Sequence, residues 1–155
     1  MRIGHGYDVH RLGPGSLLTL GGVPIPYKSS LIGWSDADVL THAIIDALLG
    51  AAKLNDIGAH FPPGDPQYSG ISSIILLERV NNMLEQKGYR IGNIDATVVA
   101  EQPRLREYID QMCTTLAAAL NCEPVRINVK ATTQEGLGFI GREEGIAAWA
   151  VALIE

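Results

Sequence analysis

The segment 37–53 most constrains how this chain can fold, because its apolar spacing predicts a helix that must bury one face. Asp38, His42 and Asp46 recur at intervals of four along this helix, so their side chains lie along one edge of it. Two carboxylates and an imidazole beside a buried face need partners from elsewhere in the chain. Ser35 or Asp36 is expected to cap the helix, and Ser35 with Asp38 resembles a capping box.

The rest of the chain alternates between extended and helical patterns. Extended segments are expected at 2–12, at 17–27 as a hairpin that turns at Gly21 and Gly22, at 91–103, from 125 onward, and at 146–155. Further helices are expected at 71–89 and 106–121, with loops at 28–34 and 55–70 and a glycine-rich loop before residue 145. This order predicts an α+β fold with a mixed β-sheet and helices packed on one face, in a single domain over 1–155.

Composition excludes several classes of partner. A net charge of -5 disfavours a nucleic-acid partner, because such proteins normally carry a basic patch. No apolar run approaches the roughly 20 residues of a membrane span, and no signal peptide is visible. The two cysteines, Cys113 and Cys122, lack metal-like spacing and are interpreted as reduced thiols, which favours the cytoplasm.

Asp8, His10 and His42 form a candidate metal site. Asp8 and His10 lie two apart in an extended segment, so their side chains leave the same face, and His42 is the best third ligand. Three mixed ligands with an open position are typical of a catalytic zinc site. Asp46 is expected to accept a hydrogen bond from the His42 ring and orient it. The alternative, a hydrogen-bonded histidine with no metal, is about equally compatible with the spacing alone.

A second candidate site lies in the loop KATTQEGLGFIGR (130–142). Its glycines let backbone N–H groups approach an anion, its threonines add donors, and Glu135 can hold a hard cation such as Mg²⁺. A surface hairpin with turn glycines explains the same letters. The segments 56–58 and 100–105 are similarly ambiguous by themselves.

Taken together, four long motifs remove this ambiguity. GHGYDVHRL (4–12), SDADVLTHAIIDALLGAA (35–52), NDIGAHFP (55–62) and NVKATTQEGLGFIGREEGIAAWAVALI (128–154) span nearly the whole chain in order. They resemble the 2-C-methyl-D-erythritol 2,4-cyclodiphosphate synthases of the non-mevalonate isoprenoid pathway. The resemblance implies a homotrimeric phosphorus–oxygen lyase with active sites between subunits. Its substrate would be 4-diphosphocytidyl-2-C-methyl-D-erythritol 2-phosphate, whose 2-phosphate attacks the β-phosphate and releases CMP.

The resemblance also implies roles for individual residues. Zn²⁺ or another divalent cation would be bound by Asp8, His10 and His42, and Mg²⁺ or Mn²⁺ would be held between Glu135 and the substrate phosphates. Residues that would act on the reacting phosphates are Trp34, Ser35 and Thr133, with Thr132 beside the diphosphate. The sugar side and its covering loop would involve Asp56, Ile57, Gly58, Phe61 and Asp65. The cytidine pocket, on the neighbouring subunit, would comprise Ala100, Pro103, Arg104, Leu105 and Ala131. Phe139 and Arg142 would face a cavity on the trimer axis that can take an isoprenoid diphosphate.

Position 34 departs from the family pattern, in which histidine usually precedes the Ser-Asp pair. Trp34 keeps one N–H donor but cannot accept or carry a proton, so impaired turnover with retained metal and nucleotide binding is expected. The alternative function is therefore a homologue with weakened or no turnover that still binds nucleotide or isoprenoid diphosphate. Smaller departures are Pro63-Gly64, Glu101 and Arg104.

The final strand, IAAWAVALIE, is apolar on both faces and includes Trp149. Such a strand suits burial under a helix layer or against another subunit, and the pattern alone does not choose between them.

Overall fold

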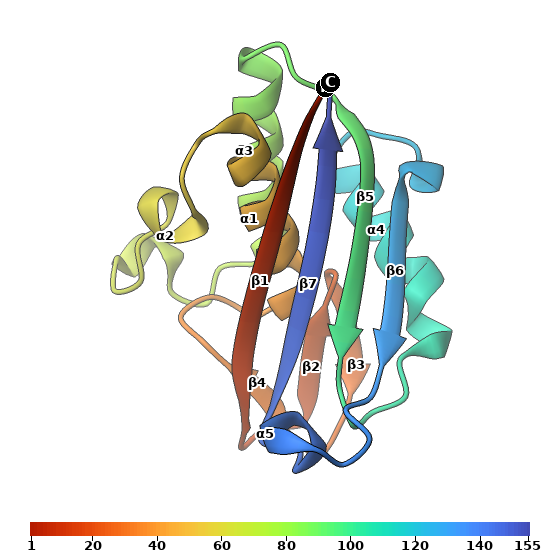
Figure 1. Ribbon diagram of the computed structural model, residues 1–155. Coiled ribbons are helices and arrows are strands. Elements are labelled where there is room, and N and C mark those ends of the chain that lie inside the picture. The colour runs from red at the N-terminus through yellow and green to blue at the C-terminus, as the bar shows by residue number, and fades with distance from the viewer.

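A five-stranded mixed sheet forms the frame of the molecule (Figure 1). The computed structural model describes residues 1–155 and orders the strands β4-β1-β7-β5-β6. Their bounds are β1 Arg2–Gly13, β4 Ser30–Ile32, β5 Ile91–Val99, β6 Ile127–Thr132 and β7 Gly145–Ile154. Only β5 and β6 pair in parallel, and the other neighbours are antiparallel. A separate hairpin joins β2 (Leu17–Leu20) to β3 (Val23–Pro26), with Gly21 and Gly22 at its turn as predicted.

Three long helices cover one face of this sheet and lie behind it in Figure 1: α1 (Val39–Ala52), α3 (Ser73–Gln86) and α4 (Ile109–Ala119). Short helices are α2 (Ile57–His60), α5 (Gly138–Gly141), η1 (Pro66–Tyr68), η2 (Arg106–Tyr108) and η3 (Pro124–Arg126). The main core is one cluster of 39 buried residues, and α1 is buried along most of its length. The predicted α+β class, with helices on one face of a mixed sheet, is confirmed. Helices of the length and apolarity that a bilayer span requires do not occur.

The structure corrects the sequence-based boundaries in three places. Residues 30–32, expected in a loop, form β4 because they pair with the end of β1, where Leu12 lies opposite Leu31. The strand expected over 91–103 ends at Val99. The segment 55–70 contains α2 and η1 rather than loop alone. Each difference arises from pairing or packing with distant residues, which local sequence does not specify.

The helix cap is a fourth correction. Asp38, rather than Ser35 or Asp36, caps α1 and accepts from the Thr41 backbone N–H at 3.0 Å. The same carboxylate accepts from the backbone N–H groups of Gly21 at 2.9 Å and Gly22 at 2.7 Å. Burial raises the pKa of Asp38 and outweighs these hydrogen bonds, which lower it. Asp38 thus serves the fold, because it fastens the β2–β3 turn to the start of α1.

Close contact between β1 and α1 positions the candidate site. Gly4, Gly6, Asp8 and His10 share the face of β1 that lies against α1. A Cβ atom added at Gly6 would lie 1.9 Å from the Ala43 carbonyl oxygen, and one at Gly4 would lie 2.0 Å from that of Ala47. The two glycines therefore let the helix backbone approach the strand. This approach brings His42 on α1 within reach of Asp8 and His10.

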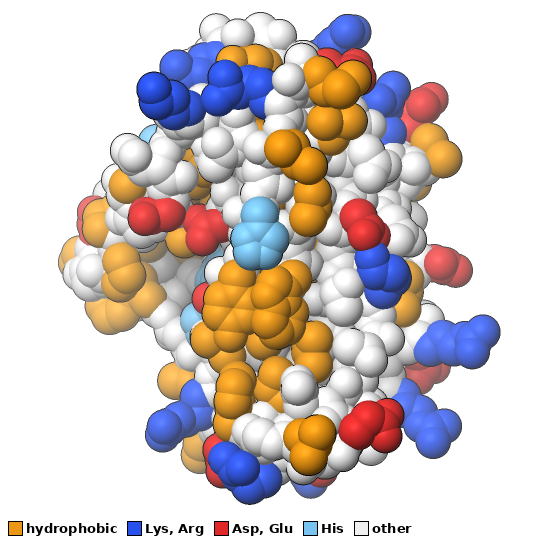
Figure 2. Space-filling view, in the orientation of Figure 1, with side chains coloured by type: hydrophobic (Ala, Val, Ile, Leu, Met, Phe, Trp, Pro, Cys, Tyr) orange, Lys and Arg blue, Asp and Glu red, His pale blue; other side chains and the backbone are white.

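The opposite face of the sheet is open and partly apolar. Ile3, Tyr7 and Val9 of β1 alternate outward, beside Trp149 and Val151 of β7, and Figure 2 shows their apolar cluster at the centre of this face. The Tyr7 and Trp149 rings lie 4.8 Å apart. The other face of β7 is buried under the helices. The final strand therefore meets the helix layer on one face and leaves Trp149, which is 39% exposed, on the other.

Candidate active site

The side chains predicted as metal ligands meet at one point between β1 and α1. Asp8 Oδ2 lies 2.9 Å from His42 Nδ1 and 3.0 Å from His10 Nε2, and the two nitrogens are 3.2 Å apart. Ligands around a tetrahedral zinc at about 2.0–2.1 Å are separated by roughly 3.3 Å. The triangle of donor atoms needs only a slight expansion to hold such an ion.

The tautomer of His10 directs a lone pair into this triangle. His10 Nδ1 lies 2.8 Å from the Ile32 carbonyl oxygen, which can only accept, so Nδ1 carries the proton. In the neutral ring, Nε2 then presents its lone pair to Asp8. Gly33 makes room for this ring, because a Cβ there would lie 2.8 Å from His10 Cε1. Pairing of β4 with β1 thus fixes one ligand.

The partner expected for His42 is corrected by the structure. Asp46 accepts a hydrogen bond from the Ile57 backbone N–H at 2.7 Å and has no hydrogen bond to the His42 ring. His42 Nε2 instead lies 2.8 Å from Ser73 Oγ and 3.1 Å from Ser35 Oγ. Helical spacing correctly placed Asp46 on the same edge of α1 as His42. Its carboxylate, however, accepts a hydrogen bond from the backbone at the start of α2 instead of from the His42 ring.

The electrostatics of the triad favour a cation. Burial acts to raise the pKa of Asp8, but hydrogen bonds and charge interactions with His10 and His42 outweigh it and lower this pKa. Burial acts to lower the pKa of His10, but the hydrogen bond and charge interaction with Asp8 and the hydrogen bond to the Ile32 carbonyl together outweigh it and raise this pKa. An ionised carboxylate facing two imidazole nitrogens requires a proton or a metal between them, so the donor set fits a divalent cation.

A pocket of about 230 Å³ opens beside the triad. It brings together eight predicted residues: Asp8, His10, Trp34, Ser35, His42, Ile57, Gly58 and Phe61. Sequence reasoning missed Pro63, Tyr68 and Leu76, which also line it. In the sequence, Pro63 and Tyr68 lie in a segment without periodicity and Leu76 lies in a predicted helix. Neither position indicates that a side chain lines this pocket.

Two acidic residues of the predicted sugar-side loop cap short helices. Asp56 accepts from the Ala59 backbone N–H at 2.9 Å at the start of α2. The Asp65 side chain accepts from the Gln67 backbone and side chain at the start of η1. Neither carboxylate lines the pocket, but the short helices that they cap contribute Ile57, Gly58 and Tyr68 to its lining.

The Trp34 indole has a partner in this loop. Its Nε1–H donates to the Asp65 carbonyl oxygen at 2.9 Å, so the ring holds the loop against the pocket. The single donor that Trp34 could offer to a phosphate is therefore already engaged.

We expect Trp34→His to raise the turnover rate at this site by about 10²-fold, because a ring that can both donate and accept replaces an engaged donor. Steady-state kinetics with separate measurements of metal and nucleotide affinity tests this effect, and both affinities should stay unchanged. Trp34→Phe is the matched control, since it keeps an aromatic ring but removes the N–H together with part of the indole, and it should chiefly raise KM. An unchanged rate in Trp34→His would show that Trp34 does not limit turnover.

A second pocket, of about 280 Å³, lies where β5 and β6 end. It is lined by the predicted residues Ala100, Pro103, Arg104, Leu105, Ala131, Thr132 and Thr133, and by Glu101, Arg106 and Ile109. Glu101 Oε2 accepts from the Gln134 backbone N–H at 3.2 Å and links this pocket to the following loop. In that loop Thr133 Oγ1 donates to Glu135 at 3.2 Å.

The two pockets do not join within one chain. The triad belongs to β1 and α1, whereas the second pocket and its Thr133–Glu135 loop follow β5 and β6, beyond β7. Phe139 lies on α5, and Arg142 forms two contacts with Glu144, at 2.9 and 3.2 Å. The predicted residues thus form two separate halves.

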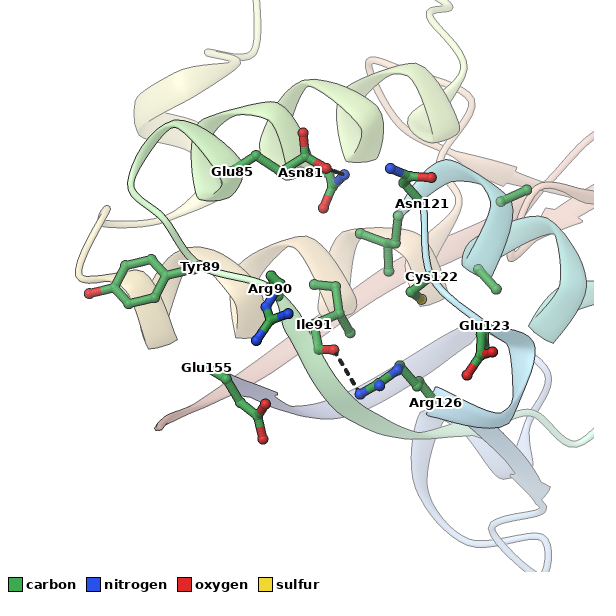
Figure 3. Close-up of a pocket in the computed structure, with 13 residues that line it drawn as sticks. Asn81, Glu85, Tyr89, Arg90, Ile91, Asn121, Cys122, Glu123, Arg126 and Glu155 are labelled. Carbon is green, nitrogen blue, oxygen red and sulfur yellow. Dashed lines mark hydrogen bonds between the residues drawn. The ribbon is translucent and has the colours of Figure 1, made fainter.

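A cavity larger than either of these two pockets lies elsewhere in the chain, as Figure 3 shows. It measures about 540 Å³ and lies near the ends of α3 and α4, beside Ile91 and Glu155. Arg126 crosses it to donate to the Ile91 carbonyl oxygen at 3.2 Å. None of the predicted site residues lines it, and its acidic and basic groups are mixed. Convergent metal donors, rather than cavity size, therefore identify the candidate site.

Fold and site together define a small α+β protein with an Asp-His-His triad that could hold a metal ion at a strand–helix contact and a separate pocket at the strand ends. The model of the YgbB family matches residues 1–155. The chain belongs to this family.

Named relatives agree along the full length. The 2-C-methyl-D-erythritol 2,4-cyclodiphosphate synthase of Dehalococcoides mccartyi is 62% identical over 155 residues, covering 100% of this chain and 99% of the relative. That of Syntrophomonas wolfei is 57% identical with the same coverage.

Solved structures show the same fold. The bifunctional IspDF of Campylobacter jejuni matches with a TM-score of 0.95 and 40% identity over 99% of this chain, which spans 42% of that longer protein. The Plasmodium falciparum IspF in complex with CDP matches with a TM-score of 0.86 and 35% identity, over 99% of this chain and 94% of that one.

Proposed function

We propose that this chain cyclises 4-diphosphocytidyl-2-C-methyl-D-erythritol 2-phosphate to 2-C-methyl-D-erythritol 2,4-cyclodiphosphate with release of CMP. The convergence of Asp8, His10 and His42 is the observation that carries this proposal. The synthases that match the full chain at 57–62% identity support the reaction, and relatives solved with CDP support a cytidine-linked substrate. The two free cysteines suit the reducing cytoplasm in which we place the enzyme.

The reaction requires two anionic phosphates to meet, so its main barrier is electrostatic. Zn²⁺ or another divalent cation at Asp8, His10 and His42 would supply positive charge for the β-phosphate. Glu135 would help to hold Mg²⁺ or Mn²⁺ against the substrate phosphates. The hydroxyl groups of Ser35 and Thr133 would act as donors, and the remaining pocket residues would orient the sugar and the base.

We propose a homotrimer in which each active site is shared between neighbours. The separation of the triad from the pocket that follows β5 and β6 supports it, because one chain does not place cytidine beside the metal. The exposed apolar residues around Tyr7 and Trp149 provide a face that self-association would bury (Figure 2). In this arrangement, Phe139 and Arg142 would face the axial cavity proposed for an isoprenoid diphosphate.

The alternative, a homologue with weak or no turnover, rests on Trp34 alone. The intact donor triangle and the full-length similarity to named synthases favour the enzyme instead. No observation supports the silent homologue independently.

The proposed function predicts metal-dependent CMP release. Purified protein given the diphosphocytidyl substrate with Zn²⁺ and Mg²⁺ should release CMP and form the cyclic diphosphate in equal amounts. Removal of the metals with a chelator should stop both, and their return should restore both. Substrate that remains intact with metal-loaded protein would contradict the proposal, and CMP without cyclic product would indicate hydrolysis instead.

A further inference from the structure

Behind His42 lies a chain of hydrogen bonds that starts on a different helix. Ser73, the first residue of α3, is fully buried, and its Oγ lies 2.8 Å from His42 Nε2. On its other side, Ser73 Oγ makes a short hydrogen bond to Asp36 Oδ1. The connection therefore runs from Asp36 through Ser73 to the ring that faces Asp8.

The chemistry of these groups fixes the direction of each bond. An ionised carboxylate can only accept, so the Ser73 hydroxyl must donate to Asp36. Its oxygen then accepts from His42 Nε2–H. With the proton held on Nε2, the Nδ1 lone pair of His42 is left for a cation beside Asp8, whose carboxylate lies 2.9 Å from Nδ1. The relay thus selects the tautomer that can bind a metal.

Asp36 is itself held firmly in place. Its Oδ2 accepts from the Ser73 backbone N–H at 2.9 Å, and its Oδ1 accepts from that of Asp38 at 3.2 Å. The preceding Ser72 caps α3 by position but makes no side-chain capping bond, so Asp36 takes over this task. Oδ2 thus binds the backbone of Ser73 and Oδ1 binds its hydroxyl group, so the Asp36 carboxylate fixes the Ser73 rotamer.

We propose that Asp36 and Ser73 form a positioning relay that sets the tautomer of His42 and strengthens its bond to a divalent cation. The inference rests on the metal site of the proposed function. Neither residue touches the cation position or the substrate pocket, and both act through the His42 ring. Outer hydrogen-bond partners of this kind orient metal-ligating histidines and increase their basicity.

The test measures the affinity of the full chain for Zn²⁺ by competition with a chelator. Ser73→Ala should weaken the affinity by about 10- to 100-fold, the range typical for loss of an outer partner. Ser72→Ala is the matched control, because it removes the neighbouring hydroxyl without breaking a hydrogen bond, and its affinity should equal that of the wild type.

A double-mutant cycle separates this relay from a general loosening of α3. Asp36→Asn should weaken Zn²⁺ binding by about tenfold, and combining it with Ser73→Ala should add almost nothing, because Asp36 acts through Ser73. In ¹⁵N-histidine spectra of the Zn²⁺-loaded protein, the His42 Nε2–H should give a hydrogen-bonded, slowly exchanging proton signal in the wild type and lose that protection in Ser73→Ala.

Three results would overturn the relay: wild-type Zn²⁺ affinity in Ser73→Ala, an equal loss in Ser72→Ala, or fully additive effects of Asp36→Asn and Ser73→Ala. A thermal unfolding curve for each variant identifies any that fails to fold, and Asp36→Asn then carries the test. Failure of the wild type to bind Zn²⁺ at all would instead contradict the proposed function, so the two failures are distinguishable.

Discussion

His42→Ala is expected to remove tight divalent-metal binding and to lower CMP release by roughly 10³-fold or more. His42 supplies one of the three converging donors, and its loss leaves Asp8 and His10 as a two-ligand site. Charge stabilisation by a bound metal contributes several kcal/mol to a transition state, and about 1.4 kcal/mol corresponds to tenfold in rate. Metal content per chain and single-turnover CMP release measure the two effects.

His5→Ala supplies the control for metal content. His5 lies on β1 with His10 but faces the open side of the sheet, where it is exposed. The His5→Ala variant should therefore keep one tightly bound divalent ion per triad. Retention of that ion in His42→Ala would refute the assignment of the site, whatever happened to the rate.

Gly6→Ala is expected to destabilise the fold by about 3 kcal/mol or more. The added Cβ would lie 1.9 Å from the Ala43 carbonyl oxygen and 2.7 Å from the Ala47 backbone nitrogen, so β1 and α1 must separate. Backbone atoms inside a helix cannot turn aside as a flexible side chain can. Because the same two elements carry Asp8, His10 and His42, metal affinity should fall together with stability.

Chemical denaturation of the metal-free protein measures this loss, and Gly50→Ala is the matched control. Gly50 lies exposed in α1, and its added Cβ would come no closer than 3.9 Å to any atom outside its own helix. Alanine is the better helix former, so this variant should gain about 0.5–1 kcal/mol. Equal stability of Gly6→Ala and the wild type would show that the strand and helix do not approach as closely as described.

Much of the fold was predictable, because the strong patterns extend over many residues. The helices at 37–53, 71–89 and 106–121 correspond to α1, α3 and α4, whose apolar spacing is a local property. The elements missed by sequence include β4, which is three residues long, and α2 and α5, which are four residues long each. Short elements like these depend on partners such as the end of β1, which lies about 20 residues away in the chain.

The candidate site was likewise predictable where local spacing decides the position of a residue, and not where contacts between distant segments decide it. Spacing selected Asp8 and His10, because alternate residues of a strand share a face, and it left His42 as the best third ligand, which the family motifs then supported. Helical spacing also suggested Asp46 as the partner of His42, and this prediction was wrong because the Ile57 backbone N–H engages that carboxylate. Ser73 had no signal beyond a serine pair before an apolar run, 31 residues from the ring that it contacts.

The sequence by itself determined the types of donor, the faces on which they lie and the family to which the chain belongs, since these depend on residue identity and local periodicity. Only the tertiary structure decided which donors meet, which tautomer each ring adopts and which face of the sheet stays open. These outcomes depend on contacts between segments that are far apart in the chain, such as Gly6 against Ala43 and Ser73 against His42. No local pattern records such contacts.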